Sequence, residues 1–412
     1  MLTRRIFLRG SAVAMAGIGA FPSWLARAAA VEGKKRKTLV VIFQRGAADG
    51  LNIVVPFAER RYSELRPTLA IAPPAGGGNG PVGPFNGNAI DLDGRFALNG
   101  AMQPLKDLWD KRQLAIVEAT GSPDSSRSHF DAQDYMESGT TSKTTGDGWL
   151  NRALPRVGED TSPLRAVSMS RQVSRTLRGD REAIAVGDPA QFNIGNQDAA
   201  SILESMYSTS ADSQWGRTGK EAFGAMKLMQ SFNKTPYVPQ NGARYEQGGE
   251  LGRSLQQLAR LIKADAGVEA AFAEVGGWDH HGNENQQLSN MLRQFSAALA
   301  AFSQDMGDRM EDVVLVTMSE FGRTVEENGN GGTDHGHGSL MMVLGGPVQG
   351  GKVYGQWPGL EREQLFEGRD LAVTTDYRTV LSELIRSHLG QKDLTTVFPG
   401  YQPADPLGLL RA

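Results

Sequence analysis

Histidine is scarce in this chain and is gathered where it could do chemistry. Five of the six histidines occupy three short polar segments: His129, His280 with His281, and His335 with His337. Imidazoles clustered beside carboxylates are typical of metal and catalytic sites, whereas an isolated histidine such as His388 is more often structural. The 412 residues include no cysteine, which excludes thiolate-bound metals, cysteine nucleophiles and disulfides. Any metal must therefore be held by histidine, carboxylate, amide or backbone oxygen.

Two of these segments have the composition of metal-binding loops. In the sequence GGWDHHGN, Asp279 and His281 stand two residues apart on a glycine-rich loop and could reach one cation such as zinc, manganese or iron. A polar turn that caps the next helix is the alternative. In GTDHGHGS, Asp334 precedes His335 and His337, a combination with few purely structural uses. We predict metal ligands or catalytic groups in both loops.

Two further segments carry groups that could act on an anionic ester. The sequence SEFGRT places Glu320 at the end of an apolar run, and the guanidinium of Arg323 could hold an anion through paired hydrogen bonds. A surface ion pair between the two is the alternative. The sequence SSRSHFDAQ places Ser126, Ser128 and His129 at the start of a helix-like stretch, where backbone N–H groups favour phosphate or sulfate. These residues are catalytic candidates, although a serine there could equally cap the helix.

Apolar runs alternating with helix-like stretches predict the framework that positions these groups. Strands buried on both faces, as in a parallel sheet, are predicted at residues 38–43, 114–117, 268–275, 312–318 and 340–344. Residues 284–310 carry apolar side chains at three-to-four spacing and predict an amphipathic helix. Further helices are expected at 102–111 and within 198–264. This alternation predicts an α/β fold with a mostly parallel sheet covered by helices on both faces.

The polar segments all follow a predicted strand or precede the next one. In open α/β sheets, ligands bind beyond the carboxyl ends of the strands. We therefore expect the histidine segments at that edge of the sheet. No linker is long or biased enough to divide the chain, so we predict one large domain over residues 31–412.

The first 30 residues resemble a twin-arginine export signal. Arg4 and Arg5 precede an apolar pair, a weakly hydrophobic Ala/Gly-rich stretch follows, and residues 28–30 offer a small-residue cleavage site. We predict a periplasmic or secreted protein that uses the twin-arginine export machinery and, because the apolar stretch is short, has no stable membrane anchor. Removing the four arginines of this segment changes the net charge from −3 to −7. So acidic a chain is a poor candidate for binding nucleic acid.

The order of the motifs resembles that of a known family. The paired-arginine leader, LVVIFQRGAADGLNIVVP, SRSHFDAQ, GGWDHHGN, SEFGRT and GTDHGHGS occur in the order seen in an exported bacterial family of unknown function, DUF 1501. The resemblance covers essentially the whole chain after the leader. That family is grouped with the alkaline phosphatase and sulfatase superfamily. The resemblance thus implies a mixed, largely parallel sheet between helices, and hydrolysis of phosphate or sulfate esters with bound divalent metals.

The resemblance also implies roles for individual residues. The hydroxyl nucleophile of the superfamily heads a helix, which corresponds to Ser126 or Ser128 here. Its metal-binding aspartate and histidines correspond to residues of two loops: Asp279, His281, and His335 or His337.

Two strand ends depart from the superfamily pattern. One that normally carries Asp-His reads Glu320–Phe321 here. At the first strand, Gln44 stands where the aspartate is usual, and Asp49 follows five residues later. A single metal, a rearranged pair of metals and a lapsed site are all compatible with these departures.

We expect an exported hydrolase of small phosphate or sulfate esters that depends on a divalent metal such as zinc, manganese or calcium. The metal would polarise the ester while Arg323 steadies the anion. A non-catalytic exported scaffold or binding protein, and a metal that serves only stability, are the alternatives. Glu320 could act as a base rather than as a metal ligand. The predicted ligands are Asp49, Asp279, His281, Glu320, Asp334, His335 and His337.

Overall fold

The computed structural model describes residues 36–75, 88–141, 145–155, 162–187, 223–226 and 236–411. The predicted export signal lies outside these residues. So does part of the stretch 198–264, in which helices were expected. Within that stretch the structure describes α10 (Gly249–Lys263), an amphipathic helix whose apolar side chains are buried.

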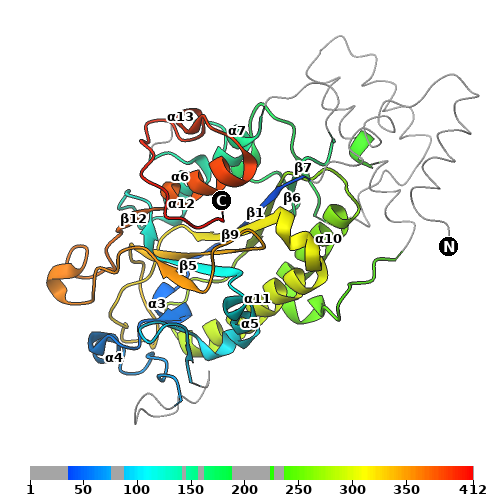
Figure 1. The fold of residues 1–412 in the computed structure, drawn as a ribbon. Helices are drawn as coiled ribbons and strands as arrows, with labels where there is room; N and C mark the ends of the chain where they lie inside the picture. Colours follow the sequence, from blue (N-terminus) through cyan, green and yellow to red (C-terminus); the bar gives the residue numbers. More distant parts are fainter. Residues whose placement is uncertain are drawn as a thin grey trace, which may run out of the picture.

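The centre of the fold is a nine-stranded sheet in which one strand runs against the others. The strand order is β11-β5-β10-β9-β1-β8-β6-β7, and β12 also pairs with β5. Strand β10 is antiparallel to both β9 and β5, whereas the other pairings are parallel. The predicted α/β class with a largely parallel sheet is therefore confirmed (Figure 1). The strands are β1 (Thr38–Gln44), β5 (Leu114–Gly121), β6 (Ala166–Ser168), β7 (Ile184–Ala185), β8 (Ala270–Val275), β9 (Val313–Ser319), β10 (Ser339–Gly345), β11 (Lys352–Tyr354) and β12 (Thr375–Asp376).

An apolar layer lies on each face of the sheet and separates it from the helices that cover that face. Along β1, Ile42 belongs to one layer, and Val41 and Phe43 belong to the other, which is the period-two alternation of a strand. Helices α5, α10 and α11 cover the first face, and α6, α7, α12 and α13 cover the second (Figure 1). Burial on both faces explains why these strands are continuous apolar runs.

The predicted helix at 284–310 is observed as α11 (Glu284–Met306). It ends at Gly307, whose positive φ of 51° turns the chain out of the helix. The predicted helix at 102–111 is a 3-10 turn followed by α5, and Pro104 lies in that turn. The other helices are α3 (Gly50–Ile53), α4 (Arg60–Leu65), α5 (Lys106–Asp110), α6 (His129–Ser138), α7 (Trp149–Ala153), α12 (Tyr377–Leu384) and α13 (Leu394–Val397). A small antiparallel sheet has the order β2-β4-β3, formed by β2 (Val54–Val55), β4 (Ala97–Leu98) and β3 (Ile90–Asp91).

One edge of the large sheet collects the segments in which chemistry is predicted. Parallel strands β1, β5, β8 and β9 all end at this edge, and antiparallel β10 begins there. The segment leading to His129 follows β5, the Asp279 loop follows β8, and the Glu320 segment follows β9. The loop that contains His335 precedes β10. The topology therefore brings together residues as far apart in the chain as His129 and His335, which are separated by 206 positions.

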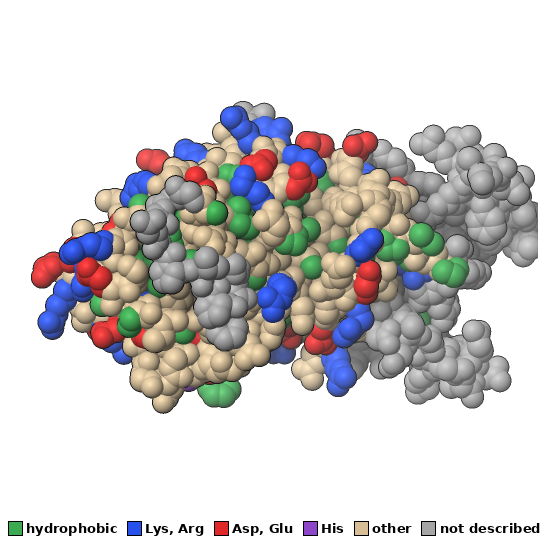
Figure 2. Space-filling model, turned by 90° about the horizontal axis from the view of Figure 1, so that it is seen from below, with side chains coloured by type: hydrophobic (Ala, Val, Ile, Leu, Met, Phe, Trp, Pro, Cys, Tyr) green, Lys and Arg blue, Asp and Glu red, His purple; other side chains and the backbone are tan. Residues whose placement is uncertain are grey.

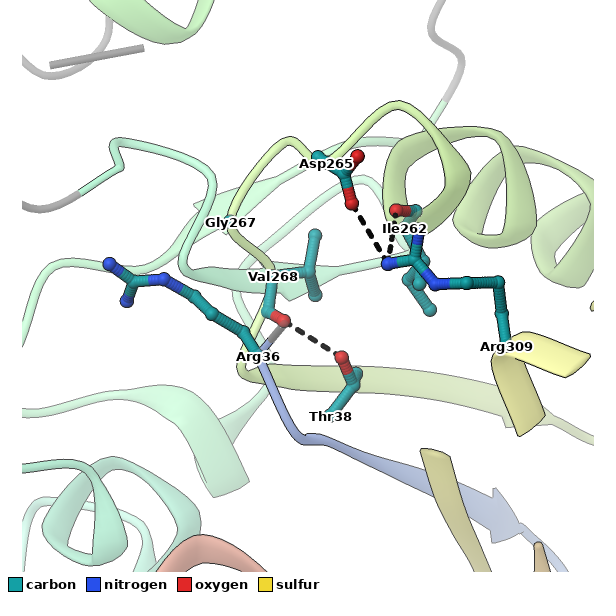
Figure 3. Close-up of a pocket in the computed structure, with 7 residues that line it drawn as sticks. All are labelled: Arg36, Thr38, Ile262, Asp265, Gly267, Val268 and Arg309. Carbon is teal, nitrogen blue, oxygen red and sulfur yellow. Dashed lines mark hydrogen bonds and ion pairs between the residues drawn. The ribbon is translucent and has the colours of Figure 1, made fainter. Parts of the chain in front are cut away.

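The opposite edge holds a small cavity without comparable chemistry. Two of its polar contacts are made within the fold (Figure 3): Thr38 Oγ1 donates to the carbonyl of Val268 at 2.8 Å, and Arg309 Nη2 lies 2.9 Å from Asp265 Oδ1. The cavity is lined by Arg36, Thr38, Ile262, Asp265, Gly267, Val268 and Arg309.

Basic and acidic side chains are interspersed over the described part of the face seen in Figure 2. Within the described ranges, no helix is both long and apolar enough to cross a membrane.

Candidate metal centre

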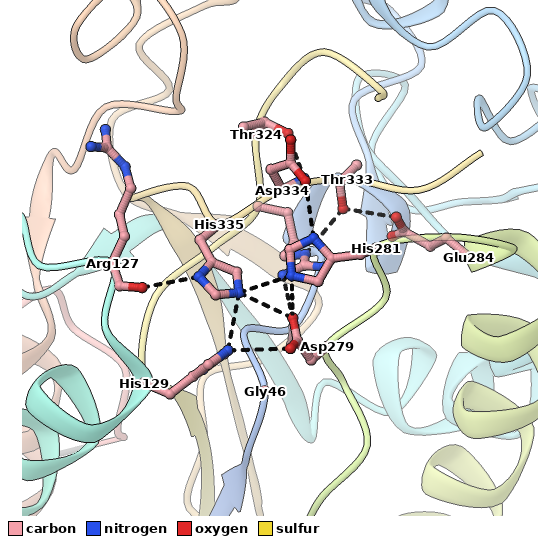
Figure 4. A network of polar contacts seen from close by, with 12 residues as sticks. Gly46, Arg127, His129, Asp279, His281, Glu284, Thr324, Thr333, Asp334 and His335 are labelled. Carbon is pink, nitrogen blue, oxygen red and sulfur yellow. Dashed lines mark hydrogen bonds and ion pairs between the residues drawn. The ribbon is translucent and has the colours of Figure 1, made fainter. Parts of the chain in front are cut away.

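Three histidines and one aspartate converge at the carboxyl edge of the sheet. The Nε2 atom of His335 lies 3.1 Å from Nε2 of His129, 3.1 Å from Nε2 of His281 and 3.2 Å from Oδ1 of Asp279. The same aspartate oxygen lies 3.0 Å from Nε2 of His281. Figure 4 shows these four side chains pointing toward one another, Asp279 and His281 from the loop after β8 and the two others from separate segments. We call His129, Asp279, His281 and His335 the histidine group.

The local sequence explains how the backbone delivers these side chains. His129 is the first residue of α6, and Gly46, just after β1, lets the chain pass close to the aspartate loop. A Cβ atom at Gly46 would lie 2.7 Å from the backbone nitrogen of Asp279, and the φ angle of 120° also favours glycine. Gly336 lies next to His335, and a Cβ there would lie 2.3 Å from a backbone atom of Arg323. Glycines therefore permit the close approach of the loops that carry the group.

The outward nitrogen of each histidine faces a hydrogen-bond acceptor. His129 Nδ1 lies 2.7 Å from Oε1 of Glu320, and His281 Nδ1 lies 2.9 Å from Oδ1 of Asp334. His335 Nδ1 lies 2.9 Å from the backbone carbonyl of Arg127. A carbonyl or an ionised carboxylate can only accept, so each Nδ1 carries the hydrogen. Carboxylate and carbonyl partners of this kind orient metal-binding histidines.

In neutral histidines of this tautomer, the inward Nε2 atom carries a lone pair and no hydrogen. Nε2 of His335 lies 3.1 Å from Nε2 of His129 and 3.1 Å from Nε2 of His281, so these lone pairs face one another. Such a cluster is repulsive unless a cation lies among the nitrogens. One candidate is a proton on His129, because the hydrogen bond to Glu320 raises the pKa of this imidazole. The other is a metal ion, and nitrogens bound tetrahedrally at 2.0–2.1 Å would be separated by roughly 3.3–3.4 Å. The side chains of His129, Asp279 and His335 could hold a metal ion.

Glu320 is a buried carboxylate kept ionised by its surroundings. Burial would raise its pKa, but hydrogen bonds from His129 and Gln133 bring that pKa below its usual value. Its Oε1 accepts from Gln133 Nε2 and from the backbone N–H of Gly46, both at 2.8 Å. Glu320 therefore touches the outer side of His129. Its carboxylate does not belong to the inward-facing donors.

Arg323 holds Asp279 and is itself enclosed. Its Nη1 lies 2.8 Å from Oδ1 of Asp279, and its side chain has no exposed surface. Burial would raise the pKa of Asp279, whereas the hydrogen bond from Arg323 holds it below its usual value. Arg323 Nε also donates to Thr333 Oγ1, which in turn donates to the buried carboxyl of Glu284 at 2.7 Å. Arg323 therefore positions a carboxylate of the histidine group.

A second ionic network contacts His335 through the backbone. Arg369 Nη2 donates to the backbone carbonyl of His335 at 2.6 Å, and its Nε lies 2.8 Å from Asp370 Oδ1. The other oxygen of Asp370 accepts from Arg127 Nη2 at 2.7 Å, and Glu367 accepts from the same nitrogen at 2.7 Å. The side chain of Asp370 is fully buried. It therefore orders both arginines that contact His335 through the backbone.

Several residues singled out in the sequence lie outside the histidine group. His337 is buried and stacks on Phe366 with ring centroids 4.3 Å apart. Asp49 forms a buried ion pair with Arg66 at 2.6 Å. Asp334 and Glu320 contact the outward nitrogens of histidines, as described above. His388 is buried, and its Nε2 lies 3.1 Å from the carbonyl of Thr38.

The two candidate serines lie at the start of α6. Ser128 is the residue before the helix, and its hydroxyl does not cap the helix. Its side chain is exposed, and its backbone N–H donates to Ser126 Oγ at 3.2 Å. Phe130, on the other side of His129, is 90% exposed, which is rare for an aromatic ring.

Residues that sequence analysis did not single out complete the site. Gln133 lies one helical turn after His129, so the spacing on α6 could have indicated its contact with Glu320. Asp370, Arg369 and Thr333 carry no comparable signal, because their roles depend on contacts between loops distant in the chain.

Comparisons with known proteins identify a family. A family model described as "Protein of unknown function (DUF1501)" matches residues 112–393, more than half of the chain. The matched range includes all four members of the histidine group. Neither the curated proteins nor the solved structures contain a match. The chain therefore belongs to the DUF1501 family of proteins of unknown function.

Proposed function

We propose that the protein is an exported metal-dependent hydrolase of phosphate or sulfate esters. The observation that carries the proposal is the convergence of three imidazole lone pairs and one carboxylate at the edge of the sheet where such folds bind ligands. The group is open to solvent on one side, since the side chains of Asp279 and His281 are 42% and 47% exposed. A purely structural metal site would more often be closed.

The donor set favours a transition metal. Three imidazoles and one carboxylate suit zinc, and manganese less well, whereas calcium takes six to eight oxygen ligands. A divalent ion held here would polarise an ester oxygen and lower the pKa of a bound hydroxyl or water. The side chains that would hold it are His129, Asp279, His281 and His335.

The surrounding residues would position these ligands. Glu320 and Asp334 fix the tautomer of His129 and His281, so that both inward nitrogens stay available. The hydroxyl of Ser128 does not cap the helix, whereas that of Ser126 accepts a hydrogen bond from a backbone N–H. Ser128 is therefore the better placed candidate nucleophile. The exposed ring of Phe130 would contact the alcohol part of the ester.

Fold and export belong to the same proposal. The mixed, largely parallel sheet with helices on both faces supports a relationship to the alkaline phosphatase and sulfatase superfamily. The paired arginines of the leader support twin-arginine export to the periplasm. Export of an already folded chain would allow the metal to be acquired in the cytoplasm.

Hydrolysis of nitrophenyl phosphate, bis-nitrophenyl phosphate and nitrophenyl sulfate by the zinc- and manganese-loaded protein tests the proposal. We expect turnover of at least one ester, loss of that turnover in Asp279→Ala, and retention in His337→Gln, a buried histidine outside the group. Ser128→Ala and Ser126→Ala then separate a serine nucleophile from attack by water. Stoichiometric metal binding without turnover of any ester would favour a non-catalytic scaffold.

A further inference from the structure

The charges around the histidine group limit what it can bind. Three carboxylates contact the group or belong to it: those of Asp279, Glu320 and Asp334. Among the described residues that contact its side chains, one guanidinium, that of Arg323, is of opposite sign. With neutral histidines, these side chains leave two negative charges. A divalent metal would cancel them and leave a site with no net charge.

The neighbouring arginines are already engaged by carboxylates. Arg323 is fully enclosed and bound to Asp279. Arg127 is bound to Asp370 and Glu367, and Figure 4 shows its side chain pointing away from the histidines. Arg369, whose side chain is 45% exposed, is likewise bound to Asp370 and donates to the backbone carbonyl of His335. Each of the three guanidinium charges is therefore already paired with a carboxylate.

A doubly charged ligand would therefore bring uncompensated charge to a partly buried site. Interactions between charges are strong there, because the surroundings screen them less than bulk water does. A singly charged ligand would leave half as much excess charge beside Glu320 and Asp334. The phosphoryl group of a phosphate monoester carries two charges above its second pKa of about 6, whereas sulfate monoesters and phosphodiesters carry one.

We infer that the ester bound at the histidine group carries a single negative charge on its reacting group, as in a sulfate monoester or a phosphodiester. This inference rests on the proposed function and narrows its substrate class. It also assigns Asp334 a second effect, since its exposed carboxylate would discriminate against dianions in addition to orienting His281.

Calorimetric binding of three small probes to the zinc-loaded protein at pH 8 tests the inference without depending on turnover. Methyl sulfate and dimethyl phosphate are monoanions, and methyl phosphate is a dianion at this pH. We expect at least one monoanion to bind at least tenfold more tightly than methyl phosphate. Equal or tighter binding of methyl phosphate, or binding of none of the three, would overturn the inference. The two monoanions distinguish a sulfate from a phosphodiester site.

A variant that removes one negative charge from the site provides the second part of the test. Asp334→Asn keeps an acceptor for His281 but removes one negative charge, so the preference for the monoanion should fall several-fold. Asp110→Asn is the matched control, because this carboxylate is 57% exposed, like that of Asp334, and contacts Lys106 rather than the histidine group, so the preference should stay unchanged. An unchanged preference in Asp334→Asn would contradict the electrostatic explanation. If a monoanion binds preferentially but no ester is hydrolysed, the proposed hydrolase function fails while the charge inference stands.

Discussion

Replacing Glu320 with glutamine should weaken metal binding while leaving His129 nearly in place. The carboxylate is fully buried, and its Oε1 accepts from His129 Nδ1 at 2.7 Å and from Gln133 and Gly46 at 2.8 Å. A glutamine carbonyl has the same size and can accept the same three hydrogen bonds. The substitution therefore removes mainly the negative charge behind the imidazole.

The size of this effect follows from the type of contact. Loss of a carboxylate that orients a metal-bound histidine typically lowers metal affinity by about 10- to 100-fold. This range corresponds to about 1.4–2.7 kcal/mol of binding free energy. The short, charge-assisted bond to His129 places the expected loss within this range and not below it.

Competition with a chromophoric zinc chelator measures the affinities of the wild type and of Glu320→Gln. Asp110→Asn removes a carboxylate that contacts Lys106 and not the histidine group, and serves as the control, with no expected change. Circular dichroism of the metal-free proteins checks that each variant is folded. A folded Glu320→Gln protein with wild-type zinc affinity would refute the assignment of Glu320 as the partner that orients a ligand.

Three other substitutions test separate parts of the structure. Burial lowers the pKa of His388 to about 4, so only the unfolded chain gains a proton between roughly pH 6.5 and 4, and stability falls across that window. This group should lower the wild-type free energy of unfolding by about 2 kcal/mol between pH 7 and pH 5, and His388→Gln should lack this contribution when unfolded in urea. The same pH dependence of the free energy of unfolding in both proteins would contradict this. Asp370→Asn should reduce stability by about 2 kcal/mol and lower zinc affinity by loosening His335, and unchanged values of both would argue against the ionic network. Gly336→Ala should cost about 1–3 kcal/mol because its Cβ meets the backbone of Arg323, whereas a wild-type melting temperature would show that the loops can separate.

The central strands could be predicted because burial on both faces makes them unbroken apolar runs. The run at 312–318 is observed as β9 (Val313–Ser319), and that at 340–344 as β10 (Ser339–Gly345). The direction of β10 could not be predicted from its residues, since an antiparallel strand in a buried sheet has the same composition. Strands of two or three residues, such as β7 and β12, are too short to show any periodicity.

The position of the chemistry was more accessible to sequence reasoning than its detailed geometry. Histidines at the ends of predicted strands do lie together, because parallel strands end at one edge. Which carboxylate faces a metal and which faces the outer nitrogen of a histidine depends on differences of a few ångströms. Asp334 and His335 are neighbours in the chain, yet they contact opposite sides of the group.

Other assignments depended on partners that only folding reveals. His337 stands two residues from His335, but the chain bends between them and places its ring on Phe366. Asp49 is paired with Arg66, which no motif connected to it. The guanidinium of Arg323 was expected to face an anionic substrate, whereas it is enclosed and holds Asp279.

Anomalous X-ray scattering from crystals of the zinc-loaded protein shows whether the histidine group binds a metal ion. We expect one strong peak at the zinc absorption edge within about 2.0–2.2 Å of the Nε2 atoms of His129, His281 and His335 and of a carboxylate oxygen of Asp279. The peak should be absent from crystals of Asp279→Ala grown with the same metal. Zinc-loaded wild-type crystals with no anomalous peak among these four side chains, or with their only peak elsewhere, would show that the histidine group is not a zinc site.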